Sequence, residues 1–221
     1  MIRKKNKRGI NYHEAEKQHL KKDDLKKTKV SNQYLFKNIP PYPHPEFHVC
    51  RLKHHTDKKG LHGIRRDEGF KNPDQDSLLW WSLNVGPEGI TSAEKRLLET
   101  NYPDRTEEEK AQRQESFLGK FATSPAFKRT SRLGSYRFTF PLEEVLKAYS
   151  EQICSGEPPV MRMYATHLYK QEVMYVVLVH SPANQEKFSE YPLLPDDPNA
   201  VCAYKDGCFI WRSEAMCETH K

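Results

Sequence analysis

Hydrophobic and polar positions follow two periods along the chain, one typical of helices and one typical of strands. In 142–154, apolar side chains recur at helical spacing and would share one face of a helix. These side chains are Leu142, Val145, Leu146 and Tyr149. Residues 173–179, by contrast, are apolar on both faces, as in a strand at the centre of a sheet. We therefore expect helices and strands to be mixed within one fold.

The other expected elements are bounded by capping residues, prolines and glycines. Expected strands cover residues 46–52, 77–85, 135–140, 160–168, 172–180, 201–204 and 208–212. Expected helices cover residues 57–68, 91–100, 106–121 and 142–154. The tripeptide Lys205-Asp206-Gly207 separates the last two strands and predicts a hairpin turn. This order predicts an α+β fold with a mixed, mainly antiparallel sheet and flanking helices.

The beginning of the chain differs in charge from the rest. Residues 1–38 hold 12 Lys and Arg against four Asp and Glu, whereas the remainder holds 24 against 26. Residues 11–29 are compatible with a helix but almost lack an apolar face, so we expect a partly helical or disordered arm. Four prolines in 39–45 predict a stiff, extended connector. We expect a basic arm at 1–38, this connector at 39–45 and one α+β domain at 46–221.

The basic arm bears on partners and location. Its cations can bind RNA or an acidic protein, or the arm can simply be solvated. No apolar segment follows the N-terminal cations, and no run approaches the ~20 apolar residues of a membrane span, so we expect neither a secretory signal nor a span. Five cysteines without a signal predict free thiols in the cytoplasm. The cations within 3–8 are also compatible with a nuclear location.

Familiar enzyme motifs are missing from the sequence. There is no Gly-x-x-x-x-Gly-Lys, Gly-x-Gly-x-x-Gly, His-Glu-x-x-His or Gly-x-Ser-x-Gly. P-loop NTPases, Rossmann dehydrogenases, zincins and typical α/β hydrolases are therefore not first interpretations. The spacing of Cys202, Cys208, Cys217 and His220 does not match a zinc finger or knuckle, so we expect no metal.

Two segments of the chain carry candidate chemistry. The first is the expected strand with His48 and Arg51, followed by Leu61-His62-Gly63-Ile64 and an exit at Gly69. The second is Glu172, which begins the apolar strand. Together they resemble ADP-ribosyltransferase-like domains, which open with a strand ending in His or Arg, continue with such a helix, and carry a glutamate at the start of a later strand.

The resemblance implies NAD as the cofactor and a role for each residue. His48 and Arg51 would hold the NAD ribose or pyrophosphate. Glu172 would be the catalytic residue, since its carboxylate would stabilise the positive charge that develops as nicotinamide leaves. Ser82 is the candidate for the middle member of the family's triad, a Tyr or Ser. Lys170 stands where many members have Gln or Glu, which is compatible with a degenerate, inactive relative.

Other stretches resemble a group of small fish proteins induced by interferon or reovirus infection. They are Leu-Leu-Trp-Trp-Ser-Leu at 78–83, the segment 169–182 and Ile-Trp-Arg-Ser-Glu-Ala at 210–215. This resemblance implies a cytosolic antiviral effector of innate immunity. The alternative is a non-enzymatic interaction module whose basic arm binds RNA or an acidic protein partner.

Overall fold

The computed structural model describes most of the chain and shows a mixed fold. It describes residues 2–6, 9, 11–18, 21, 45–72, 78–111, 118, 126–127, 131, 133–169 and 172–212, with the backbone alone at 168, 169, 172 and 173. Within these ranges, helices are combined with three sheets whose strand pairs are antiparallel. The expected α+β class with mainly antiparallel strands is confirmed.

The largest sheet has the strand order β1-β2-β7-β8. Its strands are β1 (Ile2–Lys5), β2 (Asn11–Glu16), β7 (Val160–Tyr169) and β8 (Glu172–His180). Cross-strand ion pairs hold its polar edge, since the Lys4 ammonium contacts the carboxylates of Glu14 and Glu16.

The predicted helical character of residues 11–29 is therefore wrong for 11–16. These residues form β2, because β1 and β7 supply backbone partners on both sides and opposite charges face each other across the strands. Most of 19–44 lies outside the described residues, so the expected boundaries of arm, connector and domain stay predictions.

A second sheet has the order β3-β10-β9. Its strands are β3 (Phe47–Val49), β10 (Cys208–Trp211) and β9 (Cys202–Lys205). The predicted hairpin between β9 and β10 is confirmed. Asp206 and Gly207 have φ angles of 50° and 76°, and positive φ at both central residues is what a type I′ hairpin turn requires.

The pairing of β3 with β10 also joins two cysteines. Cys50 and Cys208 follow the last register pair of this ladder, with Cα atoms 4.6 Å apart, and form a disulfide. The expectation of free thiols is therefore wrong for these two residues, because antiparallel pairing brings their Cα atoms to the separation that a disulfide needs. Cys154 and Cys202 are free and buried.

The third sheet has the order β5-β4-β6, with β4 (Arg51–Thr56), β5 (Ser82–Leu83) and β6 (Tyr136–Pro141). The strand expected at 46–52 is divided at Cys50 and continues to Thr56. All six residues of β4 pair with β6, which extends the strand through His54 and His55, beyond its expected end at residue 52.

The described α-helices begin at or next to a proline, or after a residue whose side chain caps the first turn. They are α2 (Lys58–Arg66), α3 (Pro87–Asn101), α4 (Glu107–Ala111) and α6 (Leu142–Ile153), with a 3-10 turn, η1, at Pro182–Asn184. The carboxylate of Asp57 caps α2 by accepting from Gly60 N at 2.8 Å. The helix predicted at 142–154 is confirmed in α6, whereas α3 begins four residues before its predicted start, at a proline suited to the first turn.

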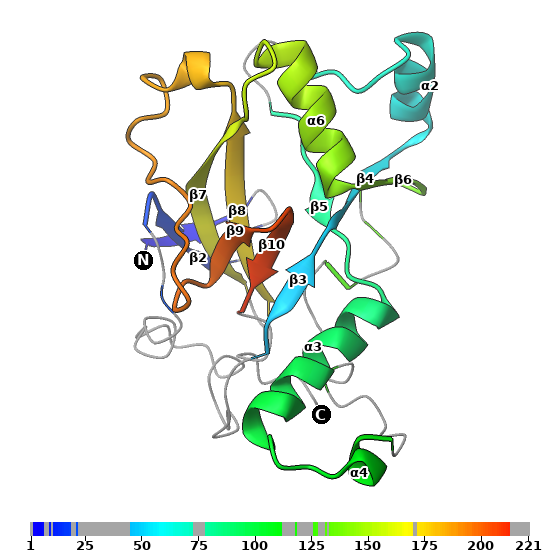
Figure 1. The fold of residues 1–221 in the computed structure, drawn as a ribbon. Coiled ribbons are helices and arrows are strands. Elements are labelled where there is room, and N and C mark those ends of the chain that lie inside the picture. The colour runs from blue at the N-terminus through cyan, green and yellow to red at the C-terminus, as the bar shows by residue number, and fades with distance from the viewer. Residues whose placement is uncertain are drawn as a thin grey trace.

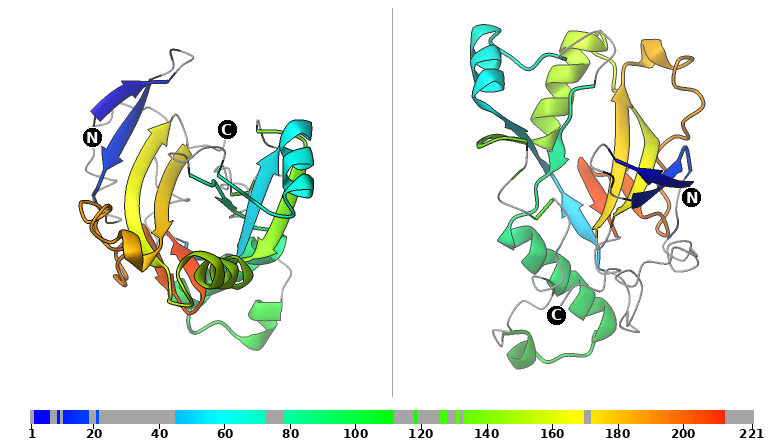
Figure 2. Two further views of the ribbon diagram at one scale, coloured as in Figure 1. Left: turned by 90° about the horizontal axis from the view of Figure 1, so that it is seen from above. Right: turned by 180° about the vertical axis from the view of Figure 1, so that it is seen from behind.

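The buried core lies where the sheets and helices meet. Its largest fully buried side chains include Phe47, Leu118, Leu142 and Met163. The four-stranded sheet lies on one side of the molecule, β4 with α2 and α6 on the other, and the β9–β10 hairpin between them (Figure 1). The same order is seen from above and from behind (Figure 2).

Candidate functional site

Strand β4 presents chemically different side chains on its two faces. Side chains alternate between faces along a strand, so Arg51, Lys53 and His55 share one face and Leu52 and His54 the other. The apolar face packs in the core, where Leu52 is buried. The polar face carries the candidate site.

The register of the neighbouring strands extends this polar face. Lys53 lies opposite Ser82 of β5 and opposite Thr139 of β6, and His55 lies opposite Arg137. Residues directly opposite each other point to the same side of a sheet. We call this surface the cationic face, and its members are Arg51, Lys53, His55, Ser82, Arg137 and Thr139.

The opposite face of the sheet is held by aromatic packing around Phe70. The Phe70 ring centroid lies 4.9 Å from that of Trp81, 5.2 Å from His54, 5.3 Å from Phe138 and 5.9 Å from Phe140. Tilted and edge-to-face rings at these separations are favourable and fix the sheet in position. His54 Nδ1 also lies 2.8 Å from the carbonyl oxygen of Trp80. This side is therefore the structural support of the cationic face.

Lys53 is the most buried member of the cationic face, with 2% of its surface exposed. Its Nζ donates to the Ala126 carbonyl oxygen at 2.9 Å, and the same oxygen accepts from Val85 N at 3.1 Å. Burial, with a smaller contribution from the Arg137 charge, lowers the pKa of Lys53 from 10.5 to about 8. Keeping the Lys53 ammonium charged therefore costs free energy in the folded protein, and a bound anion would reduce that cost.

His55 lies next to Lys53 on this face and is affected by the same charges. Burial lowers its pKa, and the charges of Lys53, Arg137 and His54 lower it further. The Nε2 atom of His55 is buried and has no hydrogen-bond partner among the described residues. The imidazole therefore has one hydrogen-bonding position that no described residue satisfies.

Two of the four residues predicted from the sequence come together on the cationic face. Arg51 is exposed at the start of β4. Ser82 is half-buried and lies opposite Lys53, which follows Arg51 by two residues on β4. His48 lies instead on β3, in another sheet, and is exposed. Its Nε2 is 2.8 Å from Glu46 Oε1.

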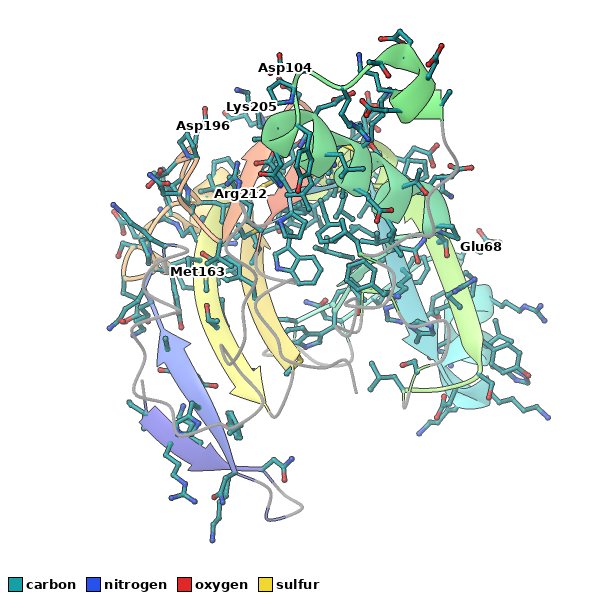
Figure 3. All side chains as sticks on the ribbon, turned by 90° about the horizontal axis from the view of Figure 1, so that it is seen from below. Glu68, Asp104, Met163, Asp196, Lys205 and Arg212 are labelled. Carbon is teal, nitrogen blue, oxygen red and sulfur yellow. A yellow bond between two sulfur atoms is a disulfide. The ribbon has the colours of Figure 1, made fainter. Side chains whose placement is uncertain are left out.

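Glu46 is the carboxylate to which His48 is bound. Arg212 Nε donates to its other oxygen at 2.6 Å, and Figure 3 places Arg212 at the β9–β10 hairpin, away from α2. Partial burial opposes ionisation of Glu46, but hydrogen bonds from His48 and Arg212 outweigh it and hold the pKa below its ordinary value. His48 is thus part of an ion-pair network that joins β3 to the end of β10.

Glu172, the predicted catalytic residue, is the first residue of β8 and pairs with Tyr169 across the β7–β8 hairpin. Its backbone alone belongs to the described part of the chain, so the direction of its carboxylate stays a prediction. Glu172 lies where it was predicted, at the start of an apolar strand.

Sequence reasoning missed Lys53, His55 and Arg137. The signal was present in Arg-Leu-Lys-His-His-Thr, where a charged or polar residue alternates with residues that pack. It was not used because the strand was expected to end at residue 52. Among the described residues no group of three or more His, Cys, Asp or Glu side chains is placed to hold a metal ion.

The chain matches no protein-family model, no curated protein and no solved structure. Within the ranges that the structure describes, no helix combines the length and apolar character needed to cross a membrane.

Proposed function

We propose that this protein is an ADP-ribosyltransferase-like domain that binds NAD on the cationic face. The carrying observation is that Arg51 and Ser82, both selected from the sequence, share that face with Lys53, His55 and Arg137. NAD contains a doubly charged pyrophosphate. Guanidinium groups and hydroxyls are the groups that recognise phosphate oxygens in proteins.

The roles of the residues follow from their chemistry. Arg51 and Arg137 are exposed and would contact the pyrophosphate, whereas Lys53 would stabilise it from below. Glu172 would act on the ribose next to nicotinamide, where its carboxylate stabilises the developing oxocarbenium charge. The sequence resemblance implies a setting in cytosolic antiviral defence. Lys170, where many members of the family have Gln or Glu, is compatible with a protein that binds NAD without turning it over.

Calorimetric titration of NAD tests the proposal. We expect Arg51→Gln and Arg137→Gln each to weaken NAD binding about tenfold, since a hydrogen bond to a charged group contributes about 1.5–3 kcal/mol and these side chains are partly solvated. The matched control is Lys147→Gln, which removes one exposed charge from α6 and should leave the affinity unchanged.

Catalysis is tested separately by nicotinamide release from NAD. Glu172→Gln should keep the affinity for NAD and abolish any release, because it keeps the shape of the side chain and removes its charge. Failure of the wild-type protein to bind NAD at millimolar concentration would overturn the proposal. Binding without release in the wild type would assign the protein to the inactive relatives.

A further inference from the structure

Helix α2 presents a basic outer side to solvent. Its nine residues include four Lys and Arg, one His and no acidic residue. Leu61 is buried and Ile64 is half-buried against the protein. The exposed side chains are Lys58, Lys59, His62, Arg65 and Arg66, which we call the α2 basic face. The helix lies at the periphery of the molecule (Figure 1).

Most of this charge has no counter-charge within the described residues. Arg66 Nε bonds Asp67 Oδ1 at 2.8 Å, and Lys71 lies 3.7 Å from the other oxygen of the same carboxylate. The nearby Asp57 accepts the capping hydrogen bond at the start of the helix. In the described part of the chain, no carboxylate lies within ion-pair distance of Lys58, Lys59 or Arg65.

The placement of two lysines in the first turn is unfavourable for the isolated protein. Lys58 and Lys59 stand at the positive end of the helix dipole, where a cation costs about 0.3–1 kcal/mol. A negatively charged partner along α2 would offset this cost and the mutual repulsion of the cations.

The same side of the helix is hollowed. Lys59, His62, Gly63 and Arg66 lie on one helical face and line a shallow, open hollow. A methyl group added at Gly63 would contact nothing within 4 Å, so the helix surface is open at this position. Arg66 lies seven positions after Lys59, a rise of about 10 Å along the helix axis.

We infer that the α2 basic face binds the phosphate backbone of a single-stranded nucleic acid. A row of cations along an open hollow fits a linear polyanion. Interfacial helices insert an apolar face into a membrane, but Leu61 and Ile64 of α2 face the protein instead. A lipid surface therefore fits this helix less well than a nucleic-acid strand.

Two exposed aromatic side chains beside β4, the strand that leads into α2, favour a single strand over a duplex. Tyr136 is 40% exposed and lies opposite Thr56, the residue that ends β4 just before the helix. Trp80 is 55% exposed, and its carbonyl oxygen lies 2.8 Å from the His54 ring of the same strand. Unpaired bases can stack on such rings, whereas the bases of a duplex are already stacked.

Fluorescence anisotropy with 12-nucleotide oligouridylate and oligothymidylate tests the inference on the full chain. Each phosphate contact to a single strand contributes about 0.7 to the slope of log affinity against log salt. The triple variant Lys58→Gln, Lys59→Gln, Arg65→Gln should reduce that slope by about 2. Tyr136→Ala should weaken binding about tenfold and leave the slope unchanged, because stacking involves no counterion.

The controls distinguish the α2 basic face from the other cations of the chain. A matched triple variant, Lys147→Gln, Lys187→Gln, Lys205→Gln, removes the same charge elsewhere and should keep the slope. Excess NAD should not displace the oligonucleotide, since the cationic face is a different site. The inference fails if both triple variants lose binding equally. It also fails if the wild type binds phosphatidylserine vesicles through α2 but neither oligonucleotide.

Discussion

Replacing Lys53 with methionine should stabilise the fold at neutral pH. The pKa of Lys53 falls from 10.5 to about 8 on folding, chiefly through burial, so the folded protein holds this proton less tightly than the unfolded chain. At 1.36 kcal/mol per pKa unit, the cost is at most about 3 to 4 kcal/mol. Methionine gives up the bond to Ala126, worth about 1 kcal/mol, but Val85 N still satisfies that carbonyl. The net gain at pH 7 is about 2 kcal/mol.

The sign of the pH dependence follows from the same pKa. Below pH 8 Lys53 is protonated in both the folded and the unfolded protein, so the full cost of burying its charge is present. Between pH 8 and 10.5 the folded state has lost its proton while the unfolded chain still binds one, so stability rises with pH. The difference in free energy of unfolding between Lys53→Met and the wild type should therefore shrink across this window.

Urea unfolding of both proteins at several pH values measures the effect, because groups that titrate in both cancel in the difference. The control is Lys147→Met, an exposed lysine whose replacement should change stability by less than about 0.5 kcal/mol. A difference between Lys53→Met and the wild type that is constant from pH 7 to 10.5 would refute the reasoning. Destabilisation at pH 7 would also refute it.

Three further changes test the supports of the site. Gly63→Ala should stabilise α2 by up to about 1 kcal/mol in urea unfolding, because its new methyl group meets nothing within 4 Å. Gly134→Ala should cost about 2 kcal/mol or more in the same assay, because at φ 141° its Cβ would lie 2.0 Å from the Thr56 carbonyl oxygen. Reduction of the Cys50–Cys208 disulfide, which links residues 158 apart, should cost about 2–5 kcal/mol in thermal melts with a phosphine reductant. A double Cys-to-Ser variant should melt identically with and without the reductant.

Elements with strong local signals were predictable from the sequence. The apolar stripe after Pro141 gives α6, and Asp206-Gly207 gives the hairpin between β9 and β10. In both cases the residues that determine the element lie within it or next to it. The position of Glu172 at the start of β8 follows for the same reason, since the apolar run that begins there is itself the signal.

Elements that depend on distant pairing were not predictable in this way. The strand was expected to end at residue 52, and pairing with β6, more than eighty residues later, extends it through His54 and His55. β2 carries Glu14 and Glu16 and contributes Ala15 to the core, and Lys4 across the β1–β2 ladder contacts both carboxylates. The cationic face likewise arises from three strands, so Lys53 and Arg137 gain their meaning only from the register.

The cost of Lys53 to stability and its proposed use in binding have one cause, the burial of its charge. An anion bound to the cationic face would favour the charged form and raise the pKa of Lys53 again. NAD binding near pH 8.5 should therefore take up a fraction of a proton, and the calorimetric enthalpy should depend on the ionisation enthalpy of the buffer. Lys53→Met should lose this buffer dependence and bind NAD more weakly while being more stable. If the variant gained stability but kept both the affinity and the proton uptake, Lys53 would contribute nothing to the site and NAD would have to lie elsewhere.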